Sequence, residues 1–193
     1  MRCQPGTRPI TTPRLLLRRF TLADAKPMFD GWASDARQVH YLLWNPHKTV
    51  QESIDFLRPW VARYDEMPPA YRWAVCLKDS GALIGSISCN FHDGDEDPHP
   101  GYVFARSAAG QGYAHEALVG MLTYMVQVAG AEVFWAEHAK ENTASGKVLR
   151  RVGFVYDHEE VHESNDHTRR WPSLAYRLNA AEFKADIPAT FSP

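Results

Sequence analysis

Residues 101–114 place a short apolar strand, a turn of small residues and a glycine-flanked helix start in direct succession. The segment reads Gly-Tyr-Val-Phe-Ala-Arg-Ser-Ala-Ala-Gly-Gln-Gly-Tyr-Ala. A helix N-terminus carries unpaired backbone N–H groups and the positive end of the helix dipole, so it favours an anion. Gly110 and Gly112 let the backbone approach such a ligand without a Cβ in the way. The segment therefore predicts a binding site for a phosphate or diphosphate group.

The order of the predicted elements around this segment indicates a mixed α/β fold. Apolar runs predict about seven strands, at residues 15–17, 71–77, 82–91, 101–105, 132–138, 155–162 and 171–178. Helical spacing and capping residues predict helices at 22–32, 50–64, 112–128 and 142–153, with Pro27 and Pro59 expected to bend the first two. Residues 91–100 are expected to form a polar loop. Hairpins make the sheet mostly antiparallel, whereas the crossover from Gly101 to His138 demands one parallel pair in its middle.

The composition describes an ordinary globular domain. The 193 residues are 45% hydrophobic and 23% charged, with no repeat or linker, so we expect one domain over 1–193, with a core at about 12–180 and extended termini. A net charge of −2 argues against a nucleic-acid partner bound by bulk electrostatics. Three cysteines without metal spacing and the lack of an apolar N-terminal stretch predict a cytoplasmic protein. The longest uncharged run, 117–131, is too short for a membrane span.

Three kinds of phosphate site have glycine patterns related to Gly110-Gln111-Gly112. A Walker loop is excluded because no Gly-Lys-Ser/Thr follows. A dinucleotide fingerprint has two of its three glycines, with His115 in the third place and Glu132 at a distance suited to a ribose contact. That motif belongs to the first strand of repeated βαβ units, whereas a β-hairpin precedes it here.

The third interpretation is a resemblance to a known family. Ala109-Gly-Gln-Gly-Tyr-Ala114 followed by Glu116-Ala-Leu118 resembles motif A of the GNAT superfamily of acyl-CoA N-acyltransferases, whose pattern is Gln/Arg-x-x-Gly-x-Gly/Ala. Ala109 replaces the usual Gln/Arg, a departure tolerated in the RimJ/RimL-like branch. The segment 12–24, the strand Leu83–Ile87 and the Asn-x-x-Ser…Gly-Phe pattern over 142–154 are also similar to that branch.

The resemblance implies a V-shaped splay between the central parallel strands, with helices on both faces of the sheet and the pantetheine arm of coenzyme A in the gap. Backbone groups of the splayed strands would bond the pantetheine amides, and the helix N-terminus would hold the diphosphate. The cofactor-binding residues that the resemblance implies are Val103, Phe104, Gly110, Gln111, Gly112, Tyr113, Ala114, Asn142, Ser145 and Lys147, with Arg151 as a further candidate. Asn142 is equally well explained as a simple helix cap.

Catalysis of amine acetylation needs a base, because an ammonium must lose a proton before it attacks. By resemblance that base is a glutamate two residues before the Gly-Tyr of the central strand, and His99 occupies this place here. A histidine of ordinary pKa near 6.5 can do this work. Glu137 and His138 are alternatives, and an amine that is already neutral would need no base. Ser145 is the residue whose family position suggests protonation of the departing thiolate.

Other clusters carry weaker hypotheses. The acidic run 93–97 does not have EF-hand spacing, and His158, Glu160 and His162 share a strand face without a supporting cysteine; we expect no metal. Trp32, Tyr41, Trp44 and Trp73 either shape an acceptor pocket or fill the core.

Together these features predict transfer of an acetyl group from acetyl-CoA to a primary amine, by direct attack in a ternary complex. The acceptor is expected to be a protein N-terminus or a small-molecule amine, and the protein a monomer or homodimer. The alternative is a noncatalytic CoA-binding or regulatory module on the same fold.

Overall fold

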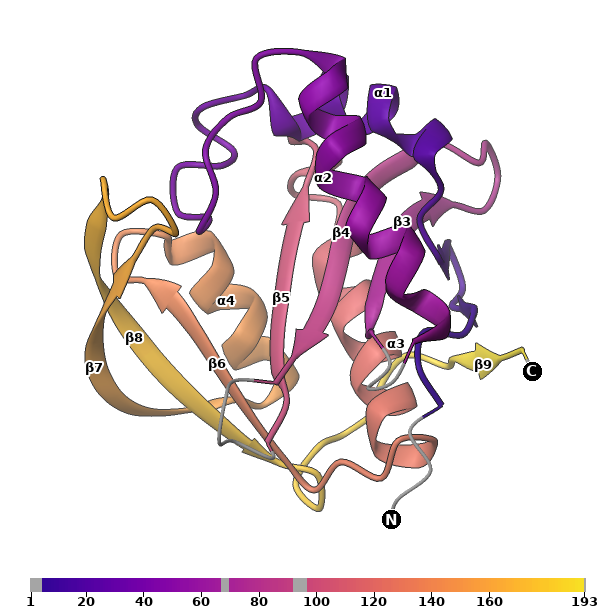
Figure 1. Ribbon diagram of the computed structural model, residues 1–193. Coiled ribbons are helices and arrows are strands. Elements are labelled where there is room, and N and C mark those ends of the chain that lie inside the picture. Colours follow the sequence, from indigo (N-terminus) through magenta and orange to yellow (C-terminus); the bar gives the residue numbers. More distant parts are fainter. Residues whose placement is uncertain (1–4, 67–69, 92–96, 193) are drawn as a thin grey trace.

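The computed structural model describes residues 5–66, 70–91 and 97–192, and their strands form two sheets (Figure 1). The first sheet has the order β5-β4-β3-β2-β1-β9, and every neighbouring pair in it is antiparallel. Its strands are β1 (Ile10–Thr11), β2 (Leu15–Arg18), β3 (Arg72–Leu77), β4 (Leu83–Asn90), β5 (His99–Phe104) and β9 (Thr190–Phe191). The second sheet has the order β6-β8-β7 and contains β6 (Val133–Ala139), β7 (Val155–Glu163) and β8 (Arg170–Asn179).

The two sheets meet where β5 lies beside β6, and Figure 1 shows these strands close at their lower ends and diverging upward. The Trp135 N–H donates to the Pro98 C=O over 3.2 Å. In a parallel ladder the next bond would run from residue 100 back to the Trp135 C=O, but Pro100 has no N–H to donate. The ladder therefore stops after one bond. The crossover places β5 beside β6 as an open V between two sheets, which corrects the expectation of one sheet with a parallel pair in its middle. The predicted mixed α/β fold with a splay is confirmed.

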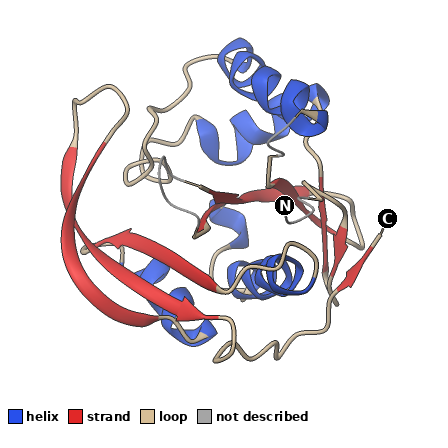
Figure 2. Ribbon diagram, turned by 60° about the horizontal axis from the view of Figure 1, so that its bottom comes forward, coloured by secondary structure: helices blue, strands red, loops and turns tan. Residues whose placement is uncertain are grey.

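Helices cover both faces of the first sheet (Figure 2). The helices are α1 (Ala25–Met28), α2 (Val50–Ala62), α3 (Tyr113–Gln127) and α4 (Thr143–Val152), of which α4 lies against α3 and β6 of the second sheet. On one face, α1 and α2 enclose a core that includes Phe20, Trp32 and Leu57. On the other face, α3 and α4 pack on a larger core. Helix α3 is buried along most of its length because apolar and small side chains occur on every side of it.

The structure differs from the sequence expectations at several elements. The expected helix 22–32 is divided into a 3-10 turn (Leu22–Asp24), the short α1 that contains Pro27, and a π-helical turn (Phe29–Ala33). Strands β1 and β9, of two residues each, were not expected. Of the acidic run 93–97, only Asp97 lies within the described residues.

Strand β5 begins at His99, which corrects the expectation of a polar loop up to residue 100. His99 pairs with Asn90 of β4, and Pro100 pairs with Cys89. The Cys89 N–H bonds instead to Tyr71, away from β5. Because residues 98 and 100 turn their main chain away from β4, the prolines do not interrupt the ladder. His99 is thereby held in a strand rather than in a loop.

Within the described ranges, no helix is both long enough and apolar enough to cross a membrane.

Candidate active site

A cleft of about 440 Å³ runs along one face of the first sheet and through the gap between β5 and β6. Successive side chains of a strand point to opposite faces of the sheet, so only every second residue of each strand faces the cleft. Trp73 points toward α3, where it makes an edge-on ring contact with Tyr124 at 5.7 Å. Arg72 therefore points to the opposite face, and its guanidinium lies 4.5 Å from the ring of Trp60 on α2.

The floor of this cleft is polar and its upper walls are aromatic. Arg72 pairs with Ser88, and Ser88 pairs with Gly101, so these three residues form one row across the sheet. The polar residues of the floor are Arg72, Ser86, Ser88, Asn90 and His99. The aromatic residues of the walls are Trp32, Tyr41, Trp44, Phe56, Trp60 and Trp171. Of the four aromatics singled out from the sequence, three line the cleft, whereas Trp73 is a core residue.

His99 and Glu137 face each other across the gap between the two sheets. His99 Nδ1 lies 3.6 Å from Glu137 Oε2, and the two side chains are 17% and 25% exposed. Both line the cleft. A carboxylate at this distance stabilises the imidazolium that forms when the histidine takes up a proton. The pair has the arrangement of a base and its charged neighbour.

His138 borders the same cleft but belongs to a closed chain of hydrogen bonds against α4 and β8. Arg150 donates to the Tyr176 hydroxyl over 3.0 Å, and that hydroxyl lies 3.3 Å from His138 Nε2. His138 Nδ1 donates to the Ala139 C=O over 2.8 Å. A neutral His138 thus has both ring nitrogens engaged, and the chain holds it against Gly146 of α4. Of the three candidate bases, the structure brings together His99 and Glu137 and separates His138 from them.

Ser145 lies on α4 at the other side of the gap, next to a residue that sequence reasoning did not select. Its hydroxyl is 2.9 Å from the hydroxyl of Tyr102, and both residues line the cleft. Burial raises the pKa of Tyr102 to about 12, against the hydrogen bond with Ser145, which lowers it. Tyr102 is therefore a protonated donor at neutral pH. Asn142 accepts from the Ser145 N–H over 3.3 Å, so it caps α4 while also bordering the cleft.

The main chain of β5 presents an open edge to the gap. The Ala105 N–H bonds to Ile84 of β4, and the Pro98 C=O bonds to Trp135 of β6. Since main-chain directions alternate along a strand, Val103 turns its backbone toward β4, whereas Tyr102 and Phe104 turn theirs toward the gap. The Phe104 C=O already accepts from the Gln38 side chain over 2.9 Å. Of the two main-chain contacts that the sequence indicated, Phe104 faces the gap and Val103 does not.

The N-terminus of α3 has the geometry of an anion site. Gly110 and Gly112 have φ values of +75° and +78°, which other residues adopt at a steric cost. The first intrahelical bond runs from the Glu116 N–H to the Gly112 C=O. The N–H groups of Tyr113 and Ala114 therefore have no acceptor within the helix.

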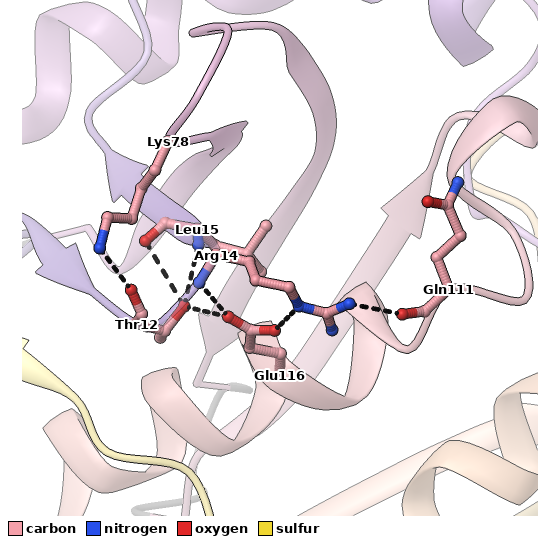
Figure 3. A network of polar contacts seen from close by, with 6 residues as sticks. All are labelled: Thr12, Arg14, Leu15, Lys78, Gln111 and Glu116. Atoms are coloured by element: carbon pink, nitrogen blue, oxygen red, sulfur yellow. Dashed lines mark hydrogen bonds and ion pairs between the residues drawn. The ribbon is translucent and has the colours of Figure 1, made fainter.

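Arg14 lies at this helix start and is fixed there by Glu116 (Figure 3). Its Nε donates to Glu116 Oε2 over 2.6 Å, its Nη1 donates to the Gln111 C=O over 2.9 Å, and its guanidinium lies 4.5 Å from the Tyr113 ring. Burial by itself raises the pKa of Glu116, but hydrogen bonds from Thr12 and Arg14 outweigh it and the net pKa is lowered. Arg14 is 48% exposed. It adds a positive charge beside the free N–H groups.

Arg14 was missed because its partners lie about a hundred residues away in the sequence. Two sequence features could have indicated the Arg14–Glu116 pair: Arg14 lies in the 12–24 segment, and the acidic Glu116 lies inside motif A. Lys147 and Arg151 are both exposed on α4 and neither lines the cleft.

A second residue that the sequence did not reveal, Arg169, holds the outer wall of the cleft. Residues 34–49, without a regular helix or strand, supply part of the aromatic wall. The Arg169 guanidinium, from the β7–β8 turn, donates to main-chain carbonyls of four residues in this segment: Val39, His40, Leu42 and Trp44. Four carbonyls on one planar guanidinium fix the segment in one geometry. The shape of the cleft thus depends on a contact between two distant parts of the chain.

Glu160 and His162 lie 3.2 Å apart as a pair. In the part of the chain that the structure describes, no group of three or more His, Cys, Asp or Glu side chains could hold a metal ion.

Comparison with known proteins agrees with this geometry. Residues 14–155 match the family described as acetyltransferase (GNAT) domain. The uncharacterized N-acetyltransferase YoaA of Bacillus subtilis (strain 168) is 27% identical over 148 residues, which cover 75% of this chain and 81% of that protein. Uncharacterized N-acetyltransferase p20 of Bacillus licheniformis is 27% identical over 144 residues, which cover 74% of this chain and 80% of that protein.

Solved structures show the same fold. A GNAT-family acetyltransferase from Bacillus anthracis superposes with a TM-score of 0.77 at 23% identity, covering 90% of this chain and 99% of that one. A GCN5-related N-acetyltransferase from Brucella melitensis has a TM-score of 0.74 at 18% identity, covering 93% of this chain and 81% of that one. Because the family match spans more than half of the sequence, the chain belongs to the GNAT acetyltransferase family.

Proposed function

We propose that this protein transfers an acetyl group from acetyl-CoA to a primary amine by direct attack in a ternary complex. The observation that carries the proposal is the convergence of three features in one cleft. These are the His99–Glu137 pair, the open main-chain edge of β5, and the Ser145 hydroxyl. A base, a surface for an extended amide-containing chain and a proton donor are what acyl transfer to an amine requires.

The residues present fit coenzyme A. Its diphosphate would be held by the N–H groups of Tyr113 and Ala114, with Arg14 beside them. Its pantetheine amides would bond the free backbone groups of β5, among them those of Tyr102, where β6 has separated. Its thioester supplies the activated acetyl group.

The side chains of the cleft then have distinct tasks. His99 takes a proton from the acceptor ammonium at Nδ1 or Nε2, and the Glu137 carboxylate stabilises the imidazolium. The neutral amine nitrogen attacks the acyl carbon, a C–N bond forms and the C–S bond breaks. Ser145 gives its hydroxyl proton to the departing thiolate, and the second proton that the amine nitrogen loses as the amide forms restores the Ser145 hydroxyl. The protonated Tyr102 hydroxyl holds Ser145 in position.

The acceptor is a protein N-terminus or a small-molecule amine, and we place the reaction in the cytoplasm. The second point is supported by Cys76 and Cys89, which are buried free thiols, as expected in a reducing compartment.

Two measurements test the proposal together. Thermal unfolding with and without acetyl-CoA reports binding, and release of free thiol across a panel of amines and peptides reports turnover. We expect stabilisation by acetyl-CoA and amine-dependent thiol release that falls by about 100-fold in His99→Gln, the range typical of a lost general base. Stabilisation without turnover on any amine would favour a noncatalytic CoA-binding module. No stabilisation at all would refute coenzyme A as the ligand.

A further inference from the structure

Arg72 has a charge that no carboxylate among the described residues neutralises. The other inward-facing arginines each have partners: Arg18 binds Asp24 through two hydrogen bonds of 2.8 Å, and Arg169 binds four carbonyls. Among residues 5–66, 70–91 and 97–192, the Arg72 guanidinium has neither a carboxylate within 4.0 Å nor a hydrogen-bond acceptor. Its contact is the face of Trp60, at 4.5 Å. A partly buried guanidinium in this state favours an anion brought by a ligand.

Burial and a nearby positive charge both destabilise the charged form of Arg72 when its guanidinium has no hydrogen-bond acceptor. Burial lowers the pKa of Arg72, and the nearby charge of Arg63 lowers it further, although Tyr64 opposes the shift. By contrast, Asp24 raises the pKa of Arg18. A ligand oxygen in the cleft would serve the Arg72 guanidinium as an acceptor.

Charge is distributed unevenly along the cleft. Glu137, beside His99, supplies a carboxylate at the gap between β5 and β6, and Arg72 supplies a cation on β3. Arg72, Ser88 and Gly101 lie in one row across three strands, and His99 is two residues further along β5. With strands about 4.8 Å apart and about 3.3 Å per residue, the Cα atoms of Arg72 and His99 are about 12 Å apart. The polar side chains of Ser88 and Asn90 lie between them.

We propose that Arg72 binds a carboxylate of the acceptor, so that the preferred acceptor is an amine that carries a carboxylate several bonds away. The amine lies at His99 and Glu137, and the carboxylate lies at Arg72, with the polar floor of β4 beneath the chain that joins them. This inference rests on the proposed function, since it assigns the acceptor end of the same cleft. The carboxylate belongs either to a free ω-amino acid or to an acidic side chain near the N-terminus of a peptide.

Matched pairs of acceptors test the proposal directly. In the first series, each ω-amino acid of three to eight carbons is compared with its own primary amide. The two compounds of a pair differ in the charge at the end far from the amine. The second pair is the tripeptide amides Ala-Asp-Ala and Ala-Asn-Ala. We expect kcat/KM for the best acceptor that carries a carboxylate to exceed that of its neutral partner by about 10- to 100-fold. This is the range for one charge-assisted hydrogen bond between a carboxylate and a guanidinium. The pair series that shows the larger ratio identifies the source of the carboxylate.

The variant Arg72→Met keeps an unbranched apolar stem against Trp60 and removes the charge. It should lower kcat/KM for the acidic acceptor to the level of its neutral partner and leave the neutral partner within about 2-fold. Arg72→Lys should retain part of the preference. Arg58→Met, which removes an exposed arginine of α2, is the control and should leave the preference unchanged. Thermal unfolding of each variant verifies that it is folded.

The outcomes separate this inference from the function on which it rests. Acetylation of amines without preference for a carboxylate, or an equal loss for both members of a pair in Arg72→Met, would overturn the role of Arg72 while the acetyltransferase stands. If no amine is acetylated by the wild type, the proposed function fails first.

Discussion

The substitution Glu116→Gln tests whether the start of α3 is built around a buried carboxylate. Glu116 is 2% exposed and accepts from the Thr12 hydroxyl at 2.7 Å, from the Arg14 N–H at 2.8 Å and from Arg14 Nε at 2.6 Å. Thr12 is 3% exposed, so its hydroxyl cannot turn to water instead. Glutamine has the same shape but presents an N–H₂ group to donors that need an acceptor.

The size of the effect follows from these contacts. A hydrogen bond to a charged acceptor contributes about 1.5–3 kcal/mol, and a neutral amide oxygen recovers about 1 kcal/mol for each donor it still serves. The Arg14 guanidinium is half-exposed, so its ion pair adds less than about 1 kcal/mol. We expect Glu116→Gln to lower the free energy of unfolding by about 3 kcal/mol at pH 7. In a domain of this length that lowers the Tm by about 6–12 °C.

The stabilisation contributed by Glu116 depends on pH in a direction that follows from its lowered pKa. The folded-state pKa of Glu116 is lowered, so its contribution is present above the unfolded pKa, about 4.3, and is lost as the pH falls through the folded value. Wild type and variant should therefore differ at pH 7, and the difference should shrink as the pH falls below the unfolded value and through the lowered folded value. Urea unfolding at pH 7 and in acid is the assay, with Asp79→Asn in the exposed β3–β4 turn as the control. Equal stability at pH 7, or a difference unchanged in acid, would refute the reasoning.

Four further predictions concern the cleft. Gly112→Val should remove acetyl-CoA binding while the protein stays soluble, because a β-branched residue resists a φ of +78°; undiminished binding by calorimetry would place the diphosphate elsewhere. His99→Gln should lower kcat/KM by about 100-fold without changing the acetyl-CoA affinity, and an unchanged kcat/KM would exclude His99 as the base. Tyr102→Phe should lower kcat by about 10-fold with little change in KM, since Ser145 loses its hydroxyl partner. Arg169→Met should raise KM for the acceptor by more than about 5-fold at constant acetyl-CoA affinity, because the wall of residues 34–49 loses its anchor; an equal loss of acetyl-CoA affinity would contradict a role confined to the acceptor side.

Much of the fold could be predicted because its signals are local. Thr49 caps α2 by accepting from the Glu52 N–H at 3.2 Å, as the capping pattern predicts. Gly112 and Gly153 both adopt left-handed conformations at the ends of α3 and α4. The broken helix at residues 22–33 was harder to predict, because Pro27 can bend a helix, shorten it or shift its start, and packing in the core decides which.

The candidate site was less predictable, since its geometry depends on pairing between strands. His99 looked like a loop residue from its two proline neighbours, and only the register with Asn90 places it in β5 opposite Glu137. Because side chains alternate along β6, Glu137 faces His99 and His138 faces α4. The place of His99 in a strand and the direction of the Glu137 side chain can be predicted only when the neighbouring strands are known.

The sequence by itself determined the order of the elements, the glycine-flanked start of α3 and the family, because each depends on residues a few positions apart. The tertiary structure alone decided that Arg14 joins the start of α3 and that Arg169 anchors the cleft wall. It also decided that Arg72 faces the cleft without an anionic partner in the part of the chain that the structure describes. These are contacts between residues far apart in the chain, and their energies depend on burial and on the charges around them. Residues 101–114 thus predict a diphosphate site from local sequence, whereas the charge that we propose for acceptor selection, that of Arg72, became visible only through packing.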